Sequence, residues 1–287
     1  MGARRFDQIQ GILQCPRSTL SDRLNKLIEA RILERAPAQA GRSEYRLTER
    51  GLDLYLVMLA LMRFGDDHLA GEDPPPLRLY HRTCGHAFRP ETVCSACNGS
   101  VTAREVDYHD GPGAGHSPSP DRPQRRRSTK ADAFERGRPS SVSRTLAILA
   151  DRWSFLIVRE CFFGVKRYDR FRENLAIAPN ILANRLNNLV ATGILEKESY
   201  QNNPPRFEYR LTPKGLDLYL PLIQMLRWGD RWTEGPSPLI LTHRKCGKAF
   251  QPLLVCDHCR MPISPRDVRY TLSYRPSAVF GSALIPP

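Results

Sequence analysis

The chain has 287 residues, of which 43 are Lys or Arg and 30 are Asp or Glu, so its formal net charge is +13. This length allows two domains of ordinary size, and 41% hydrophobic with 25% charged residues excludes a chain that is disordered throughout. The basic excess suits a polyanionic partner such as nucleic acid or an acidic membrane surface, and plain solubility is the alternative. The pI of about 9.7 favours nucleic acid. No stretch approaches the roughly 20 apolar residues of a membrane span, and the start has no apolar signal core, so we expect a cytoplasmic protein.

The sequence repeats itself. Arg23-Leu24-Asn25 returns 162 residues later as Arg185-Leu186-Asn187, and the segment 51–56 returns 164 residues later as 215–220. From Glu44 to Asp66, 14 of 23 positions are identical in the second copy. Chance does not explain such a match, so the sequence predicts a tandem duplication.

The two copies begin differently. Met1 is level with Phe163 of the second copy, so the apolar stretch Val142–Phe163, which has helical spacing, has no counterpart in the first. Either the first unit is truncated or its start lies upstream, and the sequence leaves both readings open.

The helices of the unit are clearest in the second copy. Tyr168–Asn174 is expected to form a short helix, followed by a break at Ala178-Pro179. Asn180 is expected to cap the next helix, which Gly193 ends. Its apolar face is formed by Leu182, Leu186 and Leu189, which leaves several Asn side chains on the opposite face.

A hairpin and a closing helix follow. Ile194–Lys197 and Phe207–Leu211 alternate in polarity around the turn Asn202–Pro205, which predicts two strands. Pro213 then opens a long apolar helix that continues through Trp228. This order is that of a winged helix-turn-helix, an α+β fold, and the alternative is a generic small α+β domain.

Taken in chain order, the expected architecture is α+β, with tandem winged helix-turn-helix domains that are each followed by a small zinc-ribbon-like hairpin. The segments are winged-helix copy one at 1–70, a zinc-ribbon-like module at 77–108, a flexible basic linker at 109–140, winged-helix copy two at 141–235, a second zinc-ribbon-like module at 239–272 and a tail at 273–287. The linker is rich in Pro, Gly, Ser and Arg. Its Arg125-Arg126-Arg127 triplet either follows a phosphate backbone or is a solvated charge run.

Residues 141–232 resemble the HxlR-type family of bacterial winged-helix regulators. The resemblance lies in four motifs: Leu149–Glu160 (LADRWSFLIVRE), Arg167-Tyr168, Ile181–Leu186 (ILANRL) and Pro204–Gly215 (PPRFEYRLTPKG). It extends over copy one from Arg4 to about Asp67. It implies a transcriptional regulator at the bacterial nucleoid that binds double-stranded operator DNA as a dimer, pairing through its first and last helices. The chain is then either an intramolecular pseudo-dimer or a homodimer.

The helix from Asn180 is expected to enter the major groove, because Asn and Arg side chains form bidentate hydrogen bonds with adenine and guanine. The candidate DNA-binding residues of copy two are Asn180, Asn184, Arg185, Asn187 and, at the wing tip, Arg206; those of copy one are Arg17, Ser18, Thr19, Arg23 and Arg42. Arg185 and Arg23 either contact bases or pair with a carboxylate of their own domain. Asp22 replaces Asn184 in copy one, so that copy either reads different bases or binds poorly.

Cysteine and histidine recur at the spacing of metal ligands. Copy one has His81, Cys84, Cys94 and Cys97, and copy two has His243, Cys246, Cys256 and Cys259. Two x-x turns separated by nine residues are typical of a tetrahedral Cys₃His zinc ribbon. We therefore expect one structural zinc ion per copy, held by the four residues of that copy. A redox-active CxxC pair is the competing interpretation.

The function classes follow from these patterns. A sequence-specific DNA-binding regulator is favoured, and a protein-interaction adaptor or a thiol-based redox sensor is the alternative. An enzyme is not expected, because no phosphate-binding glycine loop or catalytic triad context is present. The family's early Cys-Pro is replaced by Pro139-Ser140-Ser141, Cys161 is expected to be packing, and Cys15 is a weak redox candidate. The effector is unknown; an effector pocket is expected between the closing helix, at Leu218, Leu222, Met225 and Trp228, and the opening helix, unless that stripe is dimer core.

Overall fold

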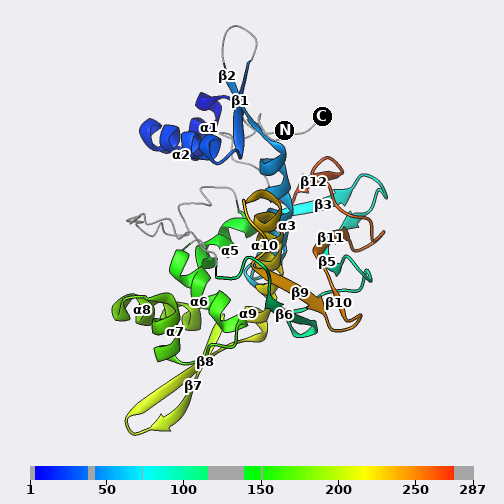
Figure 1. Cartoon of the computed structure of the whole chain (residues 1–287). Helices are drawn as coiled ribbons and strands as arrows, with labels where there is room; N and C mark the ends of the chain where they lie inside the picture. The colour runs from blue at the N-terminus through cyan, green and yellow to red at the C-terminus, as the bar shows by residue number, and fades with distance from the viewer. Residues whose placement is uncertain (1–3, 38–42, 73, 116–138, 150, 275–287) are drawn as a thin grey trace.

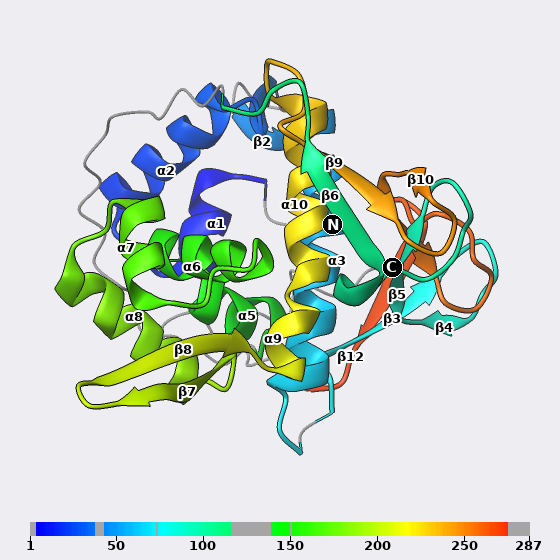
Figure 2. The same ribbon diagram turned by 60° about the horizontal axis from the view of Figure 1, so that its bottom comes forward.

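The computed structural model describes residues 4–37, 43–72, 74–115, 139–149 and 151–274. Two long helices, α3 (Glu49–His68) and α10 (Tyr219–Trp232), lie side by side at the centre (Figures 1 and 2). The helix-turn-helix units lie on one side of this pair, and the Cys/His-rich strands lie on the other. No helix among the described residues is long and apolar enough to cross a membrane.

Copy one has the expected elements from the middle of the unit onward. Helices α1 (Phe6–Leu13) and α2 (Arg17–Glu29) are followed by an antiparallel wing of β1 (Leu33–Pro37) and β2 (Ser43–Leu47). Thr48 caps α3, because its hydroxyl accepts a hydrogen bond from the Gly51 N–H at 3.1 Å.

Copy two is the complete unit. Its helices are α5 (Ser141–Leu149), α6 (Arg152–Phe162), α7 (Tyr168–Leu175) and α8 (Pro179–Ala191). The wing consists of β7 (Leu195–Asn202) and β8 (Pro205–Leu211), and α9 (Pro213–Asp217) precedes α10. The mixed helix and strand content and this element order confirm the predicted α+β winged-helix class.

Two local expectations for copy two were wrong, whereas the opening stretch Val142–Phe163 is helical as expected. It forms two helices, and the Asp151 carboxylate caps the second by accepting from the Ser154 N–H at 2.9 Å. Helix α8 begins at Pro179 with Ala178 as its N-cap, so Asn180 lies inside the first turn. The closing helix is divided at Leu218, because Pro221 has no N–H to donate to the preceding turn, whereas Val57 at the matching place keeps α3 continuous.

The main hydrophobic core belongs to copy two. It contains residues of the copy-two helices and wing, including Ile157, Phe171, Leu186 and Leu218. Side chains of α3, such as Leu61, complete it. The described residues of copy one include no counterpart of α6, and the helices of copy one are less covered. Leu189 of α8 is 2% exposed, but its equivalent Leu27 is 39% exposed, and Leu13 is 53% exposed.

The closing helices also anchor the opening of copy two. Helix α5 packs against α3, where Thr145 donates to the Leu61 carbonyl at 2.8 Å and Ser141 donates to Asp66. The partial burial of Asp66 raises its pKa above the usual range, although the Ser141 hydrogen bond opposes this. An opening helix of one copy therefore packs on the closing helix of the other.

The Cys/His-rich segments exchange strands between the copies. Copy one contributes β3 (Leu77–His81), β4 (Ala87–Phe88), β5 (Pro90–Cys94) and β6 (Val106–Asp110); copy two contributes β9 (Leu239–His243), β10 (Lys248–Ala249), β11 (Pro252–Cys256) and β12 (Val268–Leu272). Strand β12 pairs with β3, β6 with β9, and β5 with β11, all antiparallel. The two modules expected to be separate are interleaved.

This exchange also shifts the start of the expected linker. Residues 109 and 110 belong to β6, and Gly111 and Gly113 donate backbone hydrogen bonds to the Pro238 and Ser237 carbonyls at 3.0 Å each. Residues 109–115 are therefore part of the folded structure and do not belong to the expected linker. The Arg125-Arg126-Arg127 triplet lies outside the described residues.

Candidate metal centres and nucleic-acid interface

The eight predicted metal ligands gather in two groups, each of which draws on both copies. One contains His81 and Cys84 with Cys256 and Cys259, and the other contains Cys94 and Cys97 with His243 and Cys246. Within each group the ligand atoms all lie within 4.8 Å of one another. The expectation that each copy holds its own ion was wrong, because the β5–β11 pairing carries the second Cys pair of each copy across to the other.

The geometry of the two groups is nearly the same. The Cys259 Sγ lies 3.2 Å from the His81 Nδ1, and the Cys84 and Cys256 sulfurs are 3.9 Å apart. In the other group, Cys97 Sγ lies 3.2 Å from the His243 Nδ1, and the Cys94 and Cys246 sulfurs are 3.9 Å apart.

These distances fit a tetrahedral zinc ion. Zn–S bonds of about 2.3 Å place two tetrahedral sulfurs roughly 3.8 Å apart. Three thiols and one imidazole match the donor preference of Zn²⁺, and four protein ligands would leave no open coordination position for catalysis. The residues present therefore fit structural zinc.

Burial and backbone contacts tune the thiols in opposite directions. A backbone hydrogen bond from Gly99 lowers the pKa of Cys97 to about 7, and one from Met261 lowers the pKa of Cys259. Burial raises the pKa of Cys94 and raises that of Cys256 to about 11. Each group thus contains one thiol that ionises readily and one in a drier position, which a cation would have to deprotonate.

Each site is packed beside one closing helix. Cys256 shares a buried cluster with Leu59 and Met62 of α3, and Cys94 shares one with Ile223 of α10. His81 and His243 are 1% and 0% exposed, and each ring contacts a phenylalanine ring, at a centroid distance of 5.8 Å. The sites are therefore part of the scaffold on which α3 and α10 rest. His86 and His258 stack on each other outside the ligand groups, at 3.7 Å.

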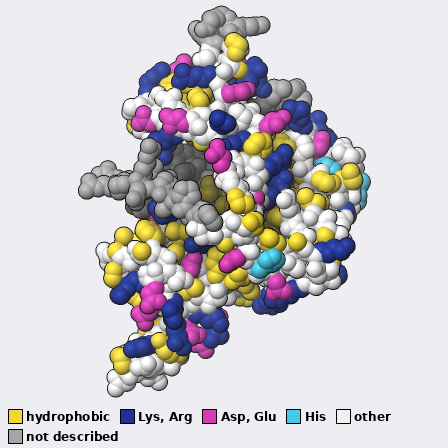
Figure 3. Space-filling model, in the orientation of Figure 1, with side chains coloured by type: hydrophobic (Ala, Val, Ile, Leu, Met, Phe, Trp, Pro, Cys, Tyr) yellow, Lys and Arg dark blue, Asp and Glu magenta, His cyan; other side chains and the backbone are white. Residues whose placement is uncertain are grey.

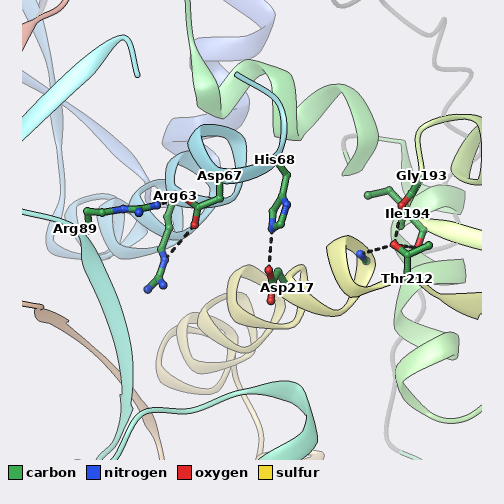
Figure 4. Close-up of polar contacts among 9 residues, drawn as sticks. Arg63, Asp67, His68, Arg89, Gly193, Ile194, Thr212 and Asp217 are labelled. Atoms are coloured by element: carbon green, nitrogen blue, oxygen red, sulfur yellow. Dashed lines mark hydrogen bonds and ion pairs between the residues drawn. The ribbon is translucent and has the colours of Figure 1, made fainter. Parts of the chain in front are cut away.

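The closing helices make reciprocal contacts that relate the two copies. His68 Nε2 lies 2.8 Å from the Asp217 carboxylate (Figure 4), and at the other end of the pair Trp232 Nε1 donates to Asp53 at 2.8 Å. Asp53 and Asp217 are equivalent positions in the duplication, as are His68 and Trp232. Asp53 also pairs with Arg227 at 3.4 Å. The contact is made twice, which shows an antiparallel pseudo-two-fold arrangement of α3 and α10.

This pairing fixes where the helix-turn-helix units lie. Helices α2 and α8 are on the same side of α3 and α10, near opposite ends of the molecule, and the two wings extend away from each other (Figure 1). Lys and Arg side chains lie over both units (Figure 3). The two helix-turn-helix units therefore lie on one side of the molecule.

On α8, three of the predicted contact residues are exposed at the surface: Asn180, Asn184 and Asn187. Asn184 Oδ1 accepts a hydrogen bond from Arg185 at 2.8 Å and one from Asn188 at 3.3 Å. These two bonds use the amide oxygen of Asn184 and not its N–H₂ group. Asn188, one turn beyond Asn184, is also exposed; the sequence pattern places it on the same polar face, but it is not among the predicted contact residues. Arg206 is exposed on the wing, at the start of β8.

Arg185 is held within the protein. Its Nε and second guanidinium nitrogen donate to the two carboxylate oxygens of Asp151, at 2.6 and 3.2 Å. Partial burial raises the pKa of Asp151, but hydrogen bonds from Arg185 and Ser154 outweigh this and hold it below the usual range. Of the two roles open from the sequence, the structure shows the intramolecular ion pair, which joins α6 to α8.

Copy one presents a different surface. Arg17 pairs with Asp7 at 3.1 Å and lies over the Phe6 ring, while Ser18, Thr19 and Arg23 are exposed. Within the part of copy one that the structure describes, no residue equivalent to Asp151 is present to pair with Arg23. Arg42 lies outside the described residues.

The cysteines away from the metal groups differ in environment. Cys161 packs against the main core, and burial raises the pKa of its thiol to about 12, so it is protonated at neutral pH. This supports a packing role. Cys15 is half-buried on the loop between α1 and α2.

Comparison with known proteins places the chain among regulators. A family model described as HxlR-like helix-turn-helix matches residues 1–73 and 148–236. Rv3095, an uncharacterized HTH-type transcriptional regulator of Mycobacterium tuberculosis, is 40% identical over 141 residues, which are 48% of this chain and 89% of that protein. An uncharacterized HTH-type transcriptional regulator of Synechocystis is 34% identical over 113 residues, 38% of this chain and 84% of that protein. The crystal structure of PA1607, provisionally assigned as a transcription factor, is 35% identical, covers 45% of this chain and 91% of that one, and has a TM-score of 0.40.

Proposed function

Because this chain belongs to the HxlR-like helix-turn-helix family, we propose that it regulates transcription by binding double-stranded DNA as an intramolecular pseudo-dimer. The relatives are named as transcriptional regulators, a non-enzymatic class. The observation that carries the proposal is the antiparallel α3–α10 pair, which presents α2 and α8 on one side of the molecule (Figure 1). One chain then supplies both helix-turn-helix units that a two-fold operator needs.

The two units contribute unequally to recognition. In copy two, the exposed Asn180, Asn184 and Asn187 face the bases, Arg206 contacts the minor groove or its phosphates, and Arg185 positions α8 through Asp151. In copy one, Arg17, Ser18, Thr19, Arg23 and Arg42 form the corresponding set. Asp22 replaces Asn184 there and repels phosphate, so copy one binds its half-site more weakly.

Fluorescence anisotropy with DNA from the chain's own upstream region tests this function. Asn184→Ala should weaken specific binding by about 1–3 kcal/mol and relax base preference, whereas Arg206→Ala should also reduce the salt dependence if it touches phosphate. In copy one, Arg23→Ala should cost less than Asn184→Ala, because copy one is proposed to bind its half-site more weakly. If neither Asn184→Ala nor Arg206→Ala changes specific binding, the docking model is wrong. If the wild type does not bind DNA, a protein-interaction adaptor is favoured.

The number of chains on DNA is a separate test. Light scattering should give one chain in solution, and footprinting should give two protected half-sites about one helical turn apart for that single chain. A stable homodimer that protects two half-sites through copy two alone would replace the pseudo-dimer.

We also propose that two structural zinc ions join the copies, each held by ligands from both. When bound, zinc would supply a fixed tetrahedral node with no catalytic position. The ligand sets are His81, Cys84, Cys256 and Cys259, and Cys94, Cys97, His243 and Cys246. The support is the distances within each group and the reciprocal strand exchange.

Double variants distinguish shared sites from one site per copy. Cys84→Ser with Cys256→Ser damages one shared site, so the chain should retain one zinc ion after equilibration with a competing chelator. Cys84→Ser with Cys94→Ser damages both, so no zinc should remain. The reverse result would show that each copy holds its own ion, and less than one zinc in the wild type would reject the metal.

A further inference from the structure

A cavity of about 700 Å³ lies where α6 and α10 meet the end of β6. Its walls are mainly apolar, with three phenylalanines of α6 and the residue after it (Phe155, Phe162 and Phe163) facing Leu222, Met225 and Tyr219 of α10. Tyr108 of β6 contacts the Phe163 ring edge-on, with centroids 5.0 Å apart. The volume falls within the range of small-molecule sites, about 300–1,000 Å³, and the aromatic lining suits a flat ring system.

The charged residues at the rim limit the ligand's chemistry. Arg159 lines the cavity, but its guanidinium already donates to Glu160 at 2.8 Å. Asp110, from the end of β6, places a carboxylate among the lining residues. An anionic ligand would therefore meet a paired cation and a repelling carboxylate, whereas an aromatic molecule without an anionic group meets no such cost.

The duplication supplies an internal comparison. Leu226 and Leu239 of this cavity correspond to Met62 and Leu77, which line a second cavity of about 710 Å³ in the other half. That cavity has no wall from an α6 counterpart, and it is lined instead by charged side chains, including Arg63, Asp66 and Asp67. The aromatic character is therefore a property of one copy only, and we expect one site per chain.

Helix α6 connects the cavity to the recognition helix. The helix that contributes Phe155 and Phe162 is capped by Asp151, which also holds Arg185 of α8 at 2.6 Å. One residue beyond Arg159, the buried Glu160 accepts from Asn174 of α7 at 2.9 Å. A ligand that shifts α6 would therefore move contacts to both helices of the helix-turn-helix.

We propose that the cavity between α6, α10 and β6 binds one flat aromatic effector that lacks an anionic group, and that α6 transmits its binding to α8. The effect on DNA rests on the proposed function; the binding itself does not. Of the four residues predicted to line an effector pocket, Leu222 and Met225 line this cavity and Leu218 and Trp228 do not.

The probe for this test is N-phenyl-1-naphthylamine, an uncharged aromatic fluorophore, titrated into the full chain. We expect saturable fluorescence enhancement with one molecule per chain. The sulfonated analogue 1-anilinonaphthalene-8-sulfonate should bind at least tenfold more weakly. Equal or tighter binding of the sulfonate would overturn the charge assignment, and the absence of saturable binding of the uncharged probe would overturn the site.

Matched variants locate the probe. Leu222→Trp should fill the cavity and weaken binding at least tenfold, whereas Met58→Trp, the same change at the equivalent position of copy one, should leave it unchanged. Phe163→Ser removes an exposed wall residue and should also weaken binding, which keeps the test valid if Leu222→Trp does not fold. Equal effects of Leu222→Trp and Met58→Trp would place the probe elsewhere.

Two further readouts distinguish the outcomes. Light scattering that shows a dimer dissociated by Leu222→Trp would mean that a second chain covers the cavity, and it would overturn the effector site. The coupling between Asp151 and Arg185 is measured by a double-mutant cycle of the two residues, with DNA affinity as the readout. If the probe binds saturably but changes neither DNA affinity nor this coupling, transmission through α6 is overturned. Failure of the wild type to bind any DNA would reject the proposed function while leaving the probe result intact.

Discussion

Gly65 lies where α3 of copy one packs closely against the start of α5 of copy two. A Cβ added to Gly65 in α3 would collide with the backbone of Ser141 at the start of α5. The equivalent glycine of α10, Gly229, has open space at its Cβ position. The same residue in the duplicated sequence therefore has a packing requirement in one copy and none in the other.

Alanine at these two glycines should have opposite effects. Gly65→Ala should destabilise the chain by about 1–3 kcal/mol, because α5 must move away from α3. Gly229→Ala should stabilise it by up to about 1 kcal/mol, since alanine favours a helix over glycine. Urea denaturation followed by circular dichroism measures both. A tolerated Gly65→Ala would mean that α5 does not pack on α3 in solution.

A second equivalent pair reports the missing opening helices of copy one. Leu189→Ala should cost about 2–5 kcal/mol, because its side chain is 2% exposed in the core. Leu27→Ala should cost less than about 1 kcal/mol, because Leu27 is 39% exposed. The same denaturation experiment compares them, and equal costs would show that another segment or chain covers α2.

At the scale of elements, α6 is the difference between the copies. It covers α7 and α8, supplies the aromatic wall of the cavity and holds Arg185 through Asp151. Among the described residues copy one has no counterpart of α6, and Leu13 of α1, Leu27 of α2 and Leu47 of β2 are exposed. The same helix-turn-helix sequence pattern thus gives a fully packed unit in one copy and a partly uncovered one in the other.

The Asp151–Arg185 pair should give a defined pH dependence. The folded-state pKa of Asp151 is lowered, so its contribution to stability is fully present above the unfolded-state pKa of about 3.9 and is lost as the pH falls through the folded-state value. Asp151→Asn should therefore reduce the free energy of unfolding by a constant amount between pH 5 and 8, and by less below about pH 4. Denaturation of wild type and variant at each pH gives this difference, in which acid loss of metal is common to both. A difference that grows towards low pH would contradict the assigned ion pair.

At the scale of the whole molecule, three antiparallel strand pairs and the α3–α10 contact connect the copies. The strand exchange follows the pseudo-two-fold axis, since β3–β12 and β9–β6 are equivalent pairings. Both helix-turn-helix units are therefore attached to a scaffold to which both copies contribute strands and helices.

Cutting the chain between the copies should reveal this interlock. A protease site inserted within residues 116–138 should, after cleavage, leave two fragments that still elute together in size-exclusion chromatography. Removing metal with a chelator should weaken or abolish their association, because each proposed zinc site takes ligands from both fragments. Uncleaved protein treated with the same chelator is the control. Fragments that separate while metal remains bound would contradict the interleaved arrangement.

The sequence by itself determined the duplication, the winged-helix order, the family and the identity of the eight candidate metal ligands. Each of these depends on local periodicity or on spacing along the chain, which sequence records directly. Only the tertiary structure decided which ligands meet, that Arg185 pairs with Asp151, and that the closing helix breaks before Pro221 in one copy. Which ligands group together depends on strand pairing between residues more than 140 positions apart. Because the Cys/His spacing is the same in both repeats, the spacing alone is compatible with sites within one copy and with sites shared between the copies. The choice between them is made by the antiparallel packing of α3 on α10, which brings β5 against β11.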